Sequence, residues 1–306
     1  MSSNQDSPLT CHKICLIIDP GMISPTQEAL SCAHKIAQEF SSHSFFKIVH
    51  FAPYLMQMRL SEFLEQEKEL FVAMPLGAVL SLGSIANITD NYPFVADLAE
   101  DLQTHVLSKD IPFFGICFSH QLFAHMHGFK VCYLKHARAS THCDVPMRKH
   151  HVFRSVDILH PKISLLAAKF SEKDYFSNNA LDLAFKDVLQ TTRNWENKDW
   201  QNLQTLPLWQ LSAQEYRVKK FIEENTEKNI ISHARHEQEV WNLSPASSEV
   251  ALGASSLSCH IEALVHTKNP SYTFQTHPET AHDSKGGYLI LKNFLYLSTF
   301  FDTIHP

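Results

Sequence analysis

The sequence predicts an α/β fold in which a parallel sheet is covered by helices on both faces. In the first half of the chain, short apolar runs alternate with segments of helical periodicity. These runs are mostly apolar and do not alternate regularly with polar residues, which is typical of parallel strands buried on both sides. Strand–helix alternation of this kind places the chain among proteins with a mostly parallel sheet.

Four strands are expected in the first half. Their apolar runs cover residues 13–19, 45–51, 77–84 and 111–116. Helical patterns separate or follow these runs, at residues 26–40, 61–70, 95–107 and 121–127.

The middle of the chain has a different character. Residues 129–252 contain no glycine, and three of the four tryptophans, Trp195, Trp200 and Trp209, lie there within fifteen residues of one another. Amphipathic spacing at 181–189 and a capping box at 212–215 indicate helices. We expect one domain over residues 1–306 with a helical insertion at about 148–208, although the same pattern fits a thicker covering on a single core.

The strand pattern returns after Val250. Residues 258–265 and 271–276 flank a turn at 268–270 and predict a hairpin, and the apolar segment 287–304 predicts a closing helix.

Composition excludes several classes of function. The chain has 26 Lys and Arg against 32 Asp and Glu, a net charge of −6 that offers no electrostatic footprint for nucleic acid or an anionic membrane. The N-terminal segment lacks a secretory pattern, and no apolar stretch is long enough to span a membrane. We therefore expect a cytoplasmic protein with no nucleic-acid or membrane partner.

Seven scattered cysteines do not form a disulfide framework. The groups Cys11-His12 with Cys15, and His125 with His127, lack the second half of a zinc site. We expect no metal and no other cofactor.

The most informative segment is GICFSHQ at 115–121. Cys117 lies between a buried strand and a helical pattern, which is the arrangement of a nucleophile elbow. A helix N-terminus stabilises a thiolate, and the N–H of Phe118 is a candidate for half of an oxyanion hole. Gly115 is expected to let the backbone turn sharply and approach its neighbours. Alone this signal is weak, because a buried cysteine at a strand end more often serves packing.

The segment FQTHPE at 274–279 strengthens the indication that Cys117 is a nucleophile. An imidazole and a carboxylate stand two residues apart, with Pro278 fixing the turn between them. His277 can take the thiol proton while Glu279 orients the ring. Cys117, His277 and Glu279 therefore form a candidate catalytic triad.

Together these motifs resemble those of the class I (triad-type) glutamine amidotransferase superfamily. Within it, the chain resembles a stand-alone member that is similar to the amidotransferase domain of GMP synthase. GICFSHQ resembles the family's G-x-C-x-G-x-Q elbow, and FQTHPE is similar to its Q-x-H-P-E segment. Residues 82–84 and 87–94 resemble its glycine-rich oxyanion strand and the segment that follows. A weaker match, at 236–245, is similar to an H-x-D-x-V…L-P segment. The resemblance covers roughly 70–148 and 209–300.

The resemblance implies a flavodoxin-like, doubly wound sheet with the site at the carboxyl ends of its strands. It implies that Cys117 attacks a γ-glutamyl amide to form a thioester, that His277 acts as base and then acid, and that Glu279 orients His277. The implied oxyanion and substrate-binding residues are Gly83, Ser84, Phe118, Gln121 and His236.

Three features depart from the family pattern. Ser119 replaces the second glycine of the elbow, at a cost of about 1 kcal/mol if that position needs a positive φ. Gln238 stands where the family has Asp. Cys117 and His277 are 160 residues apart, a long spacing that the insertion accounts for.

Three functions remain open on the sequence. The first is a stand-alone hydrolase of glutamine or another γ-glutamyl amide or peptide, whose partner is that small-molecule substrate. The second is a glutaminase subunit that delivers ammonia to a separate synthase. The third is a catalytically silent protein that binds a partner through the tryptophan-rich insertion.

Overall fold

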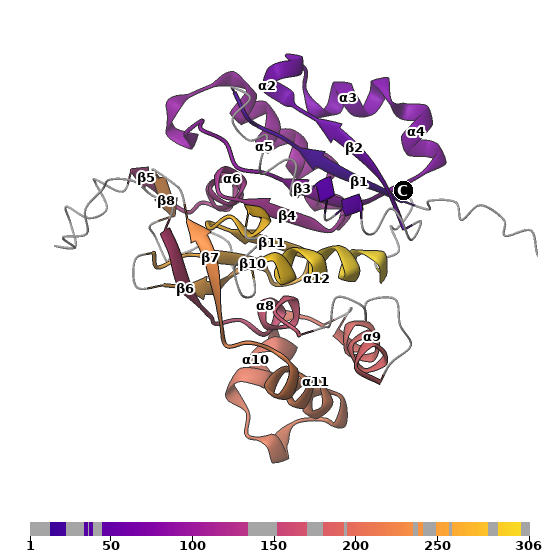
Figure 1. Ribbon diagram of the computed structural model, residues 1–306, viewed down its shortest axis with the longest axis vertical. Coiled ribbons are helices and arrows are strands. Elements are labelled where there is room, and N and C mark those ends of the chain that lie inside the picture. The colour runs from indigo at the N-terminus through magenta and orange to yellow at the C-terminus, as the bar shows by residue number, and fades with distance from the viewer. Residues whose placement is uncertain are drawn as a thin grey trace, which may run out of the picture.

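The computed structural model describes residues 13–22, 34–35, 37–38, 45–133, 152–169, 180–192, 195–234, 238–240, 249–256, 259–280 and 287–300. Within these residues, the main sheet has nine strands in the order β2-β1-β3-β4-β11-β10-β9-β6-β7. It is a mixed sheet, and Figure 1 shows it running through the centre of the molecule.

One half of the sheet is parallel. Its strands lie in the order β2-β1-β3-β4-β11, which is the order of flavodoxin-like folds. The four strands expected in the first half of the chain are confirmed here. The bounds are β1 (Lys13–Ile18), β2 (Phe46–Phe51), β3 (Leu76–Ser81), β4 (Phe113–Ile116) and β11 (Ser271–Phe274).

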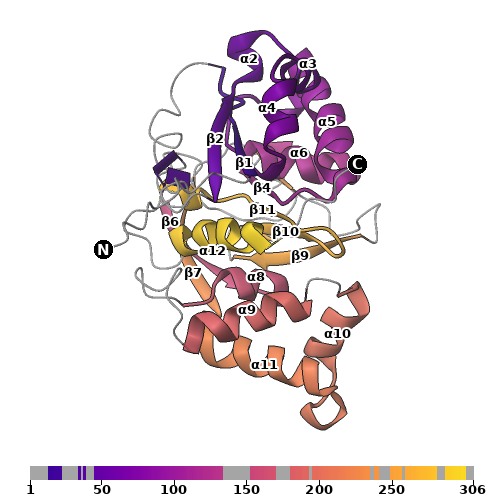
Figure 2. The same ribbon diagram turned by 90° about the vertical axis from the view of Figure 1, so that its right-hand side faces the viewer.

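Helices cover both faces of this half, as the sequence predicts. In β1, Ile14, Leu16 and Ile18 pack into one apolar cluster, and Cys15 and Ile17 point into the other. The first cluster is closed by helices before and after β3 and β4, and the second by the C-terminal helix (Figures 1 and 2). The helices are α2 (Pro53–Met56), α3 (Leu60–Gln66), α4 (Lys68–Ala73), α5 (Pro93–His105), α6 (Phe118–Met126) and α12 (Gly287–Phe300).

Short 3₁₀ turns link several of these elements. They are η1 (Ile88–Asp90), η2 (Leu107–Lys109), η3 (Leu208–Gln210) and η4 (Pro278–Thr280). The helix expected at 26–40 lies largely outside the described residues.

The other half of the sheet is antiparallel. The hairpin of β10 and β11, with its turn after His266, confirms the hairpin predicted near the C-terminus. β6 and β7 are not among the expected strands, because β6 exposes Ser155 and Asp157 on either side of buried Val156 and lacks the apolar run of an inner strand. The bounds are β10 (Ala263–His266), β9 (Val250–Ser255), β6 (Val152–Ile158) and β7 (Asn229–Ala234), with a separate pair β5 (Val131–Tyr133) and β8 (Gln238–Val240).

The helical segment lies between β6 and β7, so its bounds differ from the expected 148–208. Residues 152–158 are a strand of the main sheet, and the last helix of the segment ends at Asn225. Its capping box is confirmed, since Ser212 Oγ accepts from the N–H of Glu215 at 3.2 Å and the N–H of Ser212 donates to Glu215 Oε2 at 2.8 Å. The helices are α8 (Pro161–Leu166), α9 (Ala180–Thr192), α10 (Asn197–Thr205) and α11 (Ala213–Asn225).

These helices share the core of the sheet. Phe185 of α9 stacks on Phe221 of α11 and on Tyr296 of α12, and all three belong to the apolar cluster under α12. Figure 2 shows α9, α10 and α11 gathered at the end of the molecule farthest from β1 and β2. The segment therefore packs against the same core as α12.

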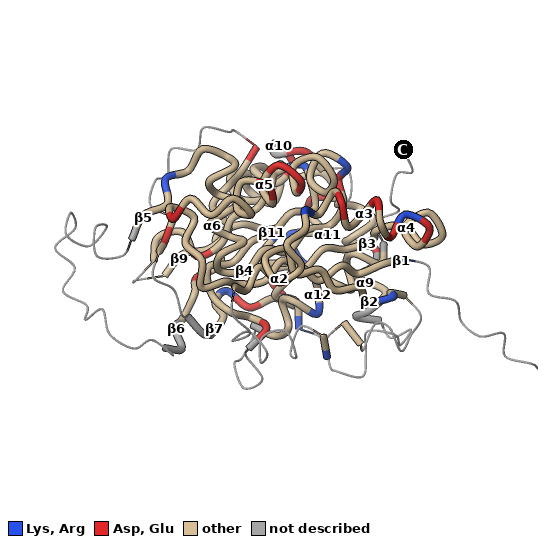
Figure 3. The backbone as a smooth tube through the Cα atoms, turned by 90° about the horizontal axis from the view of Figure 1, so that it is seen from above, with Lys and Arg blue, Asp and Glu red and all other residues tan. Residues whose placement is uncertain are grey.

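Charges of both signs are spread along the chain, and acidic residues gather on α3, α4 and α5 (Figure 3). Arg59 neutralises part of this group, donating to Glu100 Oε2 at 2.8 Å and to Asp101 Oδ1 at 2.8 Å. In the described part of the chain, every helix is too short or too polar to cross a bilayer.

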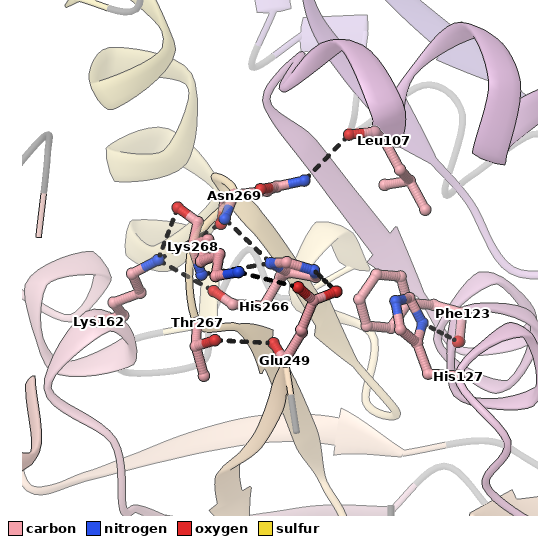
Figure 4. Close-up of polar contacts among 9 residues, drawn as sticks. All are labelled: Leu107, Phe123, His127, Lys162, Glu249, His266, Thr267, Lys268 and Asn269. Atoms are coloured by element: carbon pink, nitrogen blue, oxygen red, sulfur yellow. Dashed lines mark hydrogen bonds and ion pairs between the residues drawn. The ribbon is translucent and has the colours of Figure 1, made fainter. Parts of the chain in front are cut away.

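A polar cluster fixes the turn between β10 and β11 (Figure 4). Buried Lys162, at the start of α8, donates to the carbonyl oxygens of His266 at 2.9 Å, Asn269 at 3.4 Å and Lys268 at 3.5 Å. His266 Nδ1 accepts from the backbone N–H of Asn269 at 3.0 Å and of Lys268 at 3.3 Å. This cluster anchors the amino end of β11.

Candidate active site

Cys117 occupies the one-residue turn between β4 and α6. Its φ is 51° and its ψ −101°, a conformation that residues with a side chain rarely adopt and that marks a strained nucleophile turn. Its N–H donates to the carbonyl of Phe274 at 2.7 Å, which holds the end of β4 beside the end of β11.

The sequence suggested a sharp turn at Gly115, but the sharp turn lies at Cys117. Gly115 lies within β4, and its φ is not positive. Its expected close approach is present, because an added Cβ would lie 3.0 Å from Thr273 Cγ2.

The structure brings the three residues of the candidate triad together. β4 and β11 are parallel neighbours, so the residues that follow them meet at one edge of the sheet. His277 Nδ1 lies 2.7 Å from Glu279 Oε1, and a hydrogen bond joins the His277 ring to the Cys117 side chain. Because Nδ1 is engaged with Glu279, Nε2 is the nitrogen left for the thiol.

The electrostatics favour a protonated ring. Burial alone would lower the pKa of His277, but the Glu279 carboxylate, Cys117 and the hydrogen bonds to both raise that pKa well above its usual range. Glu279 is fully buried, and its Oε2 has no hydrogen-bond partner among the described residues. A buried carboxylate in that position stabilises an imidazolium at His277.

Gly83 lies against both reacting groups. A Cβ at this position would fall 2.9 Å from His277 Cε1 and 3.3 Å from Cys117 Cβ, so only glycine fits without displacing them. Among the described residues, the backbone N–H groups of Gly83 and Phe118 have no hydrogen-bond partner. Two such donors on either side of a nucleophile are the elements of an oxyanion hole.

The other predicted site residues make protein contacts. Ser84 Oγ donates to the carbonyl of Pro20 at 2.8 Å and accepts from the N–H of Ala86 at 3.0 Å. Buried Gln121 donates through Nε2 to the carbonyl of Gln238 at 2.7 Å. His236 lies outside the described residues.

Gln238, the residue that departs from the family's Asp, bridges two segments. Its Oε1 accepts from the N–H of Ile88 at 3.1 Å, and its Nε2 donates to Thr89 Oγ1 at 2.6 Å. The amide therefore holds η1 against β8, close to Gln121, and a shorter Asp side chain would have to move to make both contacts.

Two functional candidates were missed by the sequence. Gln275 Nε2 donates to Cys117 Sγ at 3.7 Å, and its Oε1 accepts from Gln121 Nε2 at 3.2 Å. Because alternate residues of an extended segment share one side, the spacing of Gln275 and His277 could have indicated this contact. Ser119, which also departs from the family pattern, hydrogen-bonds to β3 and the loop that follows it, and only the fold reveals those partners.

No metal centre is evident in the described ranges, where no group of three or more His, Cys, Asp or Glu side chains is arranged to hold an ion. Cys11 and His12 lie outside those ranges. Of the free cysteines described, Cys15 and Cys132 have pKa values raised by burial, that of Cys15 to about 12.

A comparison with family models identifies the family. The model for glutamine amidotransferase class-I matches residues 65–170 and 206–297, with a gap that falls within the helical segment.

Among curated proteins, the chain is 40% identical over 68 residues to one subunit of the glutamine-hydrolysing GMP synthase of Thermoplasma volcanium. It is 33% identical over 76 residues to the glutamine-hydrolysing GMP synthase of Francisella tularensis subsp. novicida. The aligned segments are 22% and 23% of this chain, and they span only 32% and 14% of those relatives.

Two solved structures share the fold over nearly the whole chain. The glutaminase domain of Trypanosoma brucei CTPS, solved with bound acivicin, aligns with a TM-score of 0.51 at 13% identity, covering 96% of this chain and 97% of that one. A protein described as a GMP synthase subunit from Thermoplasma acidophilum aligns with a TM-score of 0.50 at 16% identity, covering 94% of both. Since the family model covers more than half of the sequence, the chain belongs to the class-I glutamine amidotransferase family.

Proposed function

We propose that the chain hydrolyses the side-chain amide of glutamine, or of another γ-glutamyl compound, through a thioester on Cys117. The observation that carries the proposal is the meeting of Cys117, His277 and Glu279 at one edge of the sheet, with Gly83 against the first two. Membership of the glutamine amidotransferase family supports an enzyme of this type.

The reaction has two stages. Cys117 Sγ attacks the γ-carbonyl carbon, and the carbonyl oxygen becomes an oxyanion held by the N–H groups of Gly83 and Phe118. His277 takes the thiol proton and donates it to the leaving amine, so the C–N bond breaks and a thioester remains. His277 then takes a proton from the water that attacks the thioester and returns it to the departing sulfur, which releases the γ-carboxylate product and restores the thiol.

Glu279 and the glutamines have supporting roles in this scheme. Glu279 keeps His277 in the tautomer that presents Nε2 to the thiol and stabilises the imidazolium. Gln275 donates to the sulfur and is proposed to hold it in place. Gln121 is proposed to hold the glutamyl group after exchanging its contact with Gln238 or Gln275, and the resemblance to the family assigns Ser84 and His236 to substrate binding.

We also propose that residues 1–306 form one amidotransferase domain with a helical insertion that contains α9 and α10. The gap between the two matched ranges of the family model, 171–205, supports an insertion there.

The test is glutamate release by the purified chain. We expect release from glutamine or a γ-glutamyl amide, and its loss in Cys117→Ala. Cys132→Ala is the matched control, because Cys132 is a partly exposed cysteine on β5 outside the site. Retained activity in Cys117→Ala, or an inactive wild type in every setting, would overturn the proposal.

A second candidate is a glutaminase subunit that supplies ammonia to a synthase partner. It is favoured by the curated and structural relatives that are named as GMP synthase subunits. Activity of the wild type that appears only with a copurifying partner would support this function over stand-alone hydrolysis.

Fewer tryptophans of the insertion are available to bind a partner than its composition suggests. Trp195 and Trp200 pack against each other edge to face, and Trp200 is buried. Trp209 is 80% exposed beside Leu208, so a partner that binds through this segment would use these two residues. Alkylation of Cys117 by an electrophilic glutamine analogue distinguishes an enzyme from a silent binding protein.

A further inference from the structure

The side chain of Ser119 joins the nucleophile helix to the strand that precedes Gly83. Ser119 is the second residue of α6 and is fully buried. Its Oγ donates to the carbonyl of Leu82 at 2.7 Å and lies 2.7 Å from Ser81 Oγ. A hydroxyl has one proton, so with Leu82 as its acceptor Ser119 receives the proton of Ser81.

This hydrogen bond fixes the direction of a neighbouring N–H. The carbonyl of Leu82 and the N–H of Gly83 belong to the same peptide unit, and that unit is trans. In a trans peptide the C=O and N–H point in opposite directions. Holding the Leu82 oxygen toward α6 therefore turns the Gly83 N–H away from Ser119, while Gly83 itself lies against His277 and Cys117.

We propose that Ser119 is a positioning residue that sets the Gly83 N–H for the oxyanion of the tetrahedral intermediate. The inference rests on the proposed function. Ser119 touches no reacting atom and acts through the Leu82–Gly83 peptide.

The identity of the residue matters at this position. The sequence pattern of the family has glycine here, and glycine offers no side chain to hold the Leu82 carbonyl. The φ of Ser119 is not positive, so serine carries no backbone strain at this site. The departure from the pattern thus adds a contact between α6 and the oxyanion strand.

The effect should appear only where an oxyanion forms. Loss of an oxyanion donor lowers kcat by about 10²–10³-fold, and loss of its positioning alone should cost less, about 10-fold. Ser119→Ala and Ser119→Gly should lower kcat about 10-fold with KM within about twofold, because the contact matters in the transition state and not in substrate binding. Ser119→Gly carries the family's own residue, so a folded variant is expected even if alanine perturbs packing.

Two probes separate positioning from structure. A γ-glutamyl aldehyde adds to Cys117 to give a tetrahedral oxyanion, so its affinity should fall about 10-fold in both variants. Alkylation of Cys117 by iodoacetamide passes through no oxyanion, and its rate should stay within about twofold of the wild type. Ser81→Ala is the matched control, since it removes a buried hydroxyl of the same network but leaves the Ser119–Leu82 bond.

The outcomes are distinct. Variants with unchanged kcat and unchanged aldehyde affinity, beside an active wild type, overturn the role of Ser119 and leave the proposed function intact. Alkylation that falls as much as kcat, or Ser81→Ala that loses as much as Ser119→Ala, overturns it as well, because the effect is then general packing. A wild type inactive with or without partner overturns the proposed function and this inference with it.

Discussion

A histidine lies beside a glutamate near each end of β11, His266 at the close of β10 and His277 after β11, and the two pairs behave in opposite ways. At the carboxyl end, His277 lies 2.7 Å from Glu279, and its pKa is raised well above the usual range. At the amino end, His266 lies 3.8 Å from Glu249, and burial with the cationic neighbours lowers its pKa to about 4. Both rings are largely shielded from solvent, so burial alone does not explain the difference.

The hydrogen bonds of the rings explain it. His277 Nδ1 hydrogen-bonds to the Glu279 carboxylate, which is itself fully buried. His266 uses Nδ1 to accept two backbone N–H groups, which requires an unprotonated nitrogen, and its pKa is lowered further by His127 and Lys162. Glu249 stays 48% exposed and bonds to Lys268. A His–Glu pair is therefore a candidate base only where the carboxylate is buried and bonded to the ring.

Matched truncation of the two histidines should give the largest contrast. His277→Ala should lower kcat for glutamine hydrolysis by about 10³-fold or more, because the base and acid of both stages are lost. His266→Ala should keep kcat within about twofold while lowering the free energy of unfolding by about 1–3 kcal/mol, since two N–H groups lose their acceptor. Steady-state kinetics and urea unfolding of both variants check this, and comparable losses of kcat would remove the distinction between the two ends.

Glu279→Gln should lower kcat by about 10²-fold or more, because His277 loses the partner that orients it. It should also return the His277 pKa, followed by NMR, toward or below its ordinary value. The ring stabilises the wild-type fold fully below about pH 6.5, and this contribution declines as pH rises, because the unfolded chain releases a proton that the folded chain keeps. The stability gap between wild type and variant should therefore narrow from pH 6 upward; a gap that widens with pH would contradict the raised pKa.

Lys162→Met tests the amino end of β11. Burial lowers the pKa of Lys162 to about 7, whereas an exposed lysine titrates near 10.4. Between these values the unfolded chain holds a proton that the folded chain has released, so wild-type stability should rise with pH by up to about 1.4 kcal/mol per unit. The methionine variant should lack this contribution, which urea unfolding at pH 7, 8 and 9 measures. Parallel pH profiles for the two proteins would show that the lysine stays charged.

Glu249→Gln should have the smallest effect. Its carboxylate is half exposed and its contacts to Lys268 and His266 lie at the surface, so the change in the free energy of unfolding should stay below about 1 kcal/mol. Thermal unfolding at low and high salt measures it. A loss of activity like that of Glu279→Gln would mean that the two carboxylates are not as different as their burial indicates.

The sequence predicts the parallel half of the fold, and it locates the candidate triad in two short motifs, for separate reasons. Strands such as β3 and β4 are buried on both faces and therefore read as apolar runs. Cys117 and the pair His277 and Glu279 stand in short motifs whose geometry is local. Strands β6 and β7, at the antiparallel end of the sheet, escape prediction, because β6 exposes Ser155 and Asp157 beside buried Val156 and has no run of this kind.

The contacts that set the site precisely in space are beyond the sequence. Ser119 meets Leu82, 37 positions away, and Gln275 meets Cys117, 158 positions away. Each pairing depends on which strands are neighbours and in which register, and neither motif contains that information. The same holds for Gln238. Its hydrogen bonds to Ile88 and Thr89 of η1 cannot be predicted from the sequence, where Gln238 appears only as a replacement of the family's Asp.

The stacking of Phe185 on Tyr296 and Phe221 has a consequence for shortened versions of this protein. Removing α9–α11 would take away Phe185 and Phe221 and open the apolar wall of α12 around Tyr296 to water, and such a chain would tend to aggregate whatever its catalytic competence. Point changes at the rim, such as at Trp209, leave that wall covered and are the sounder way to ask what the added helices contribute.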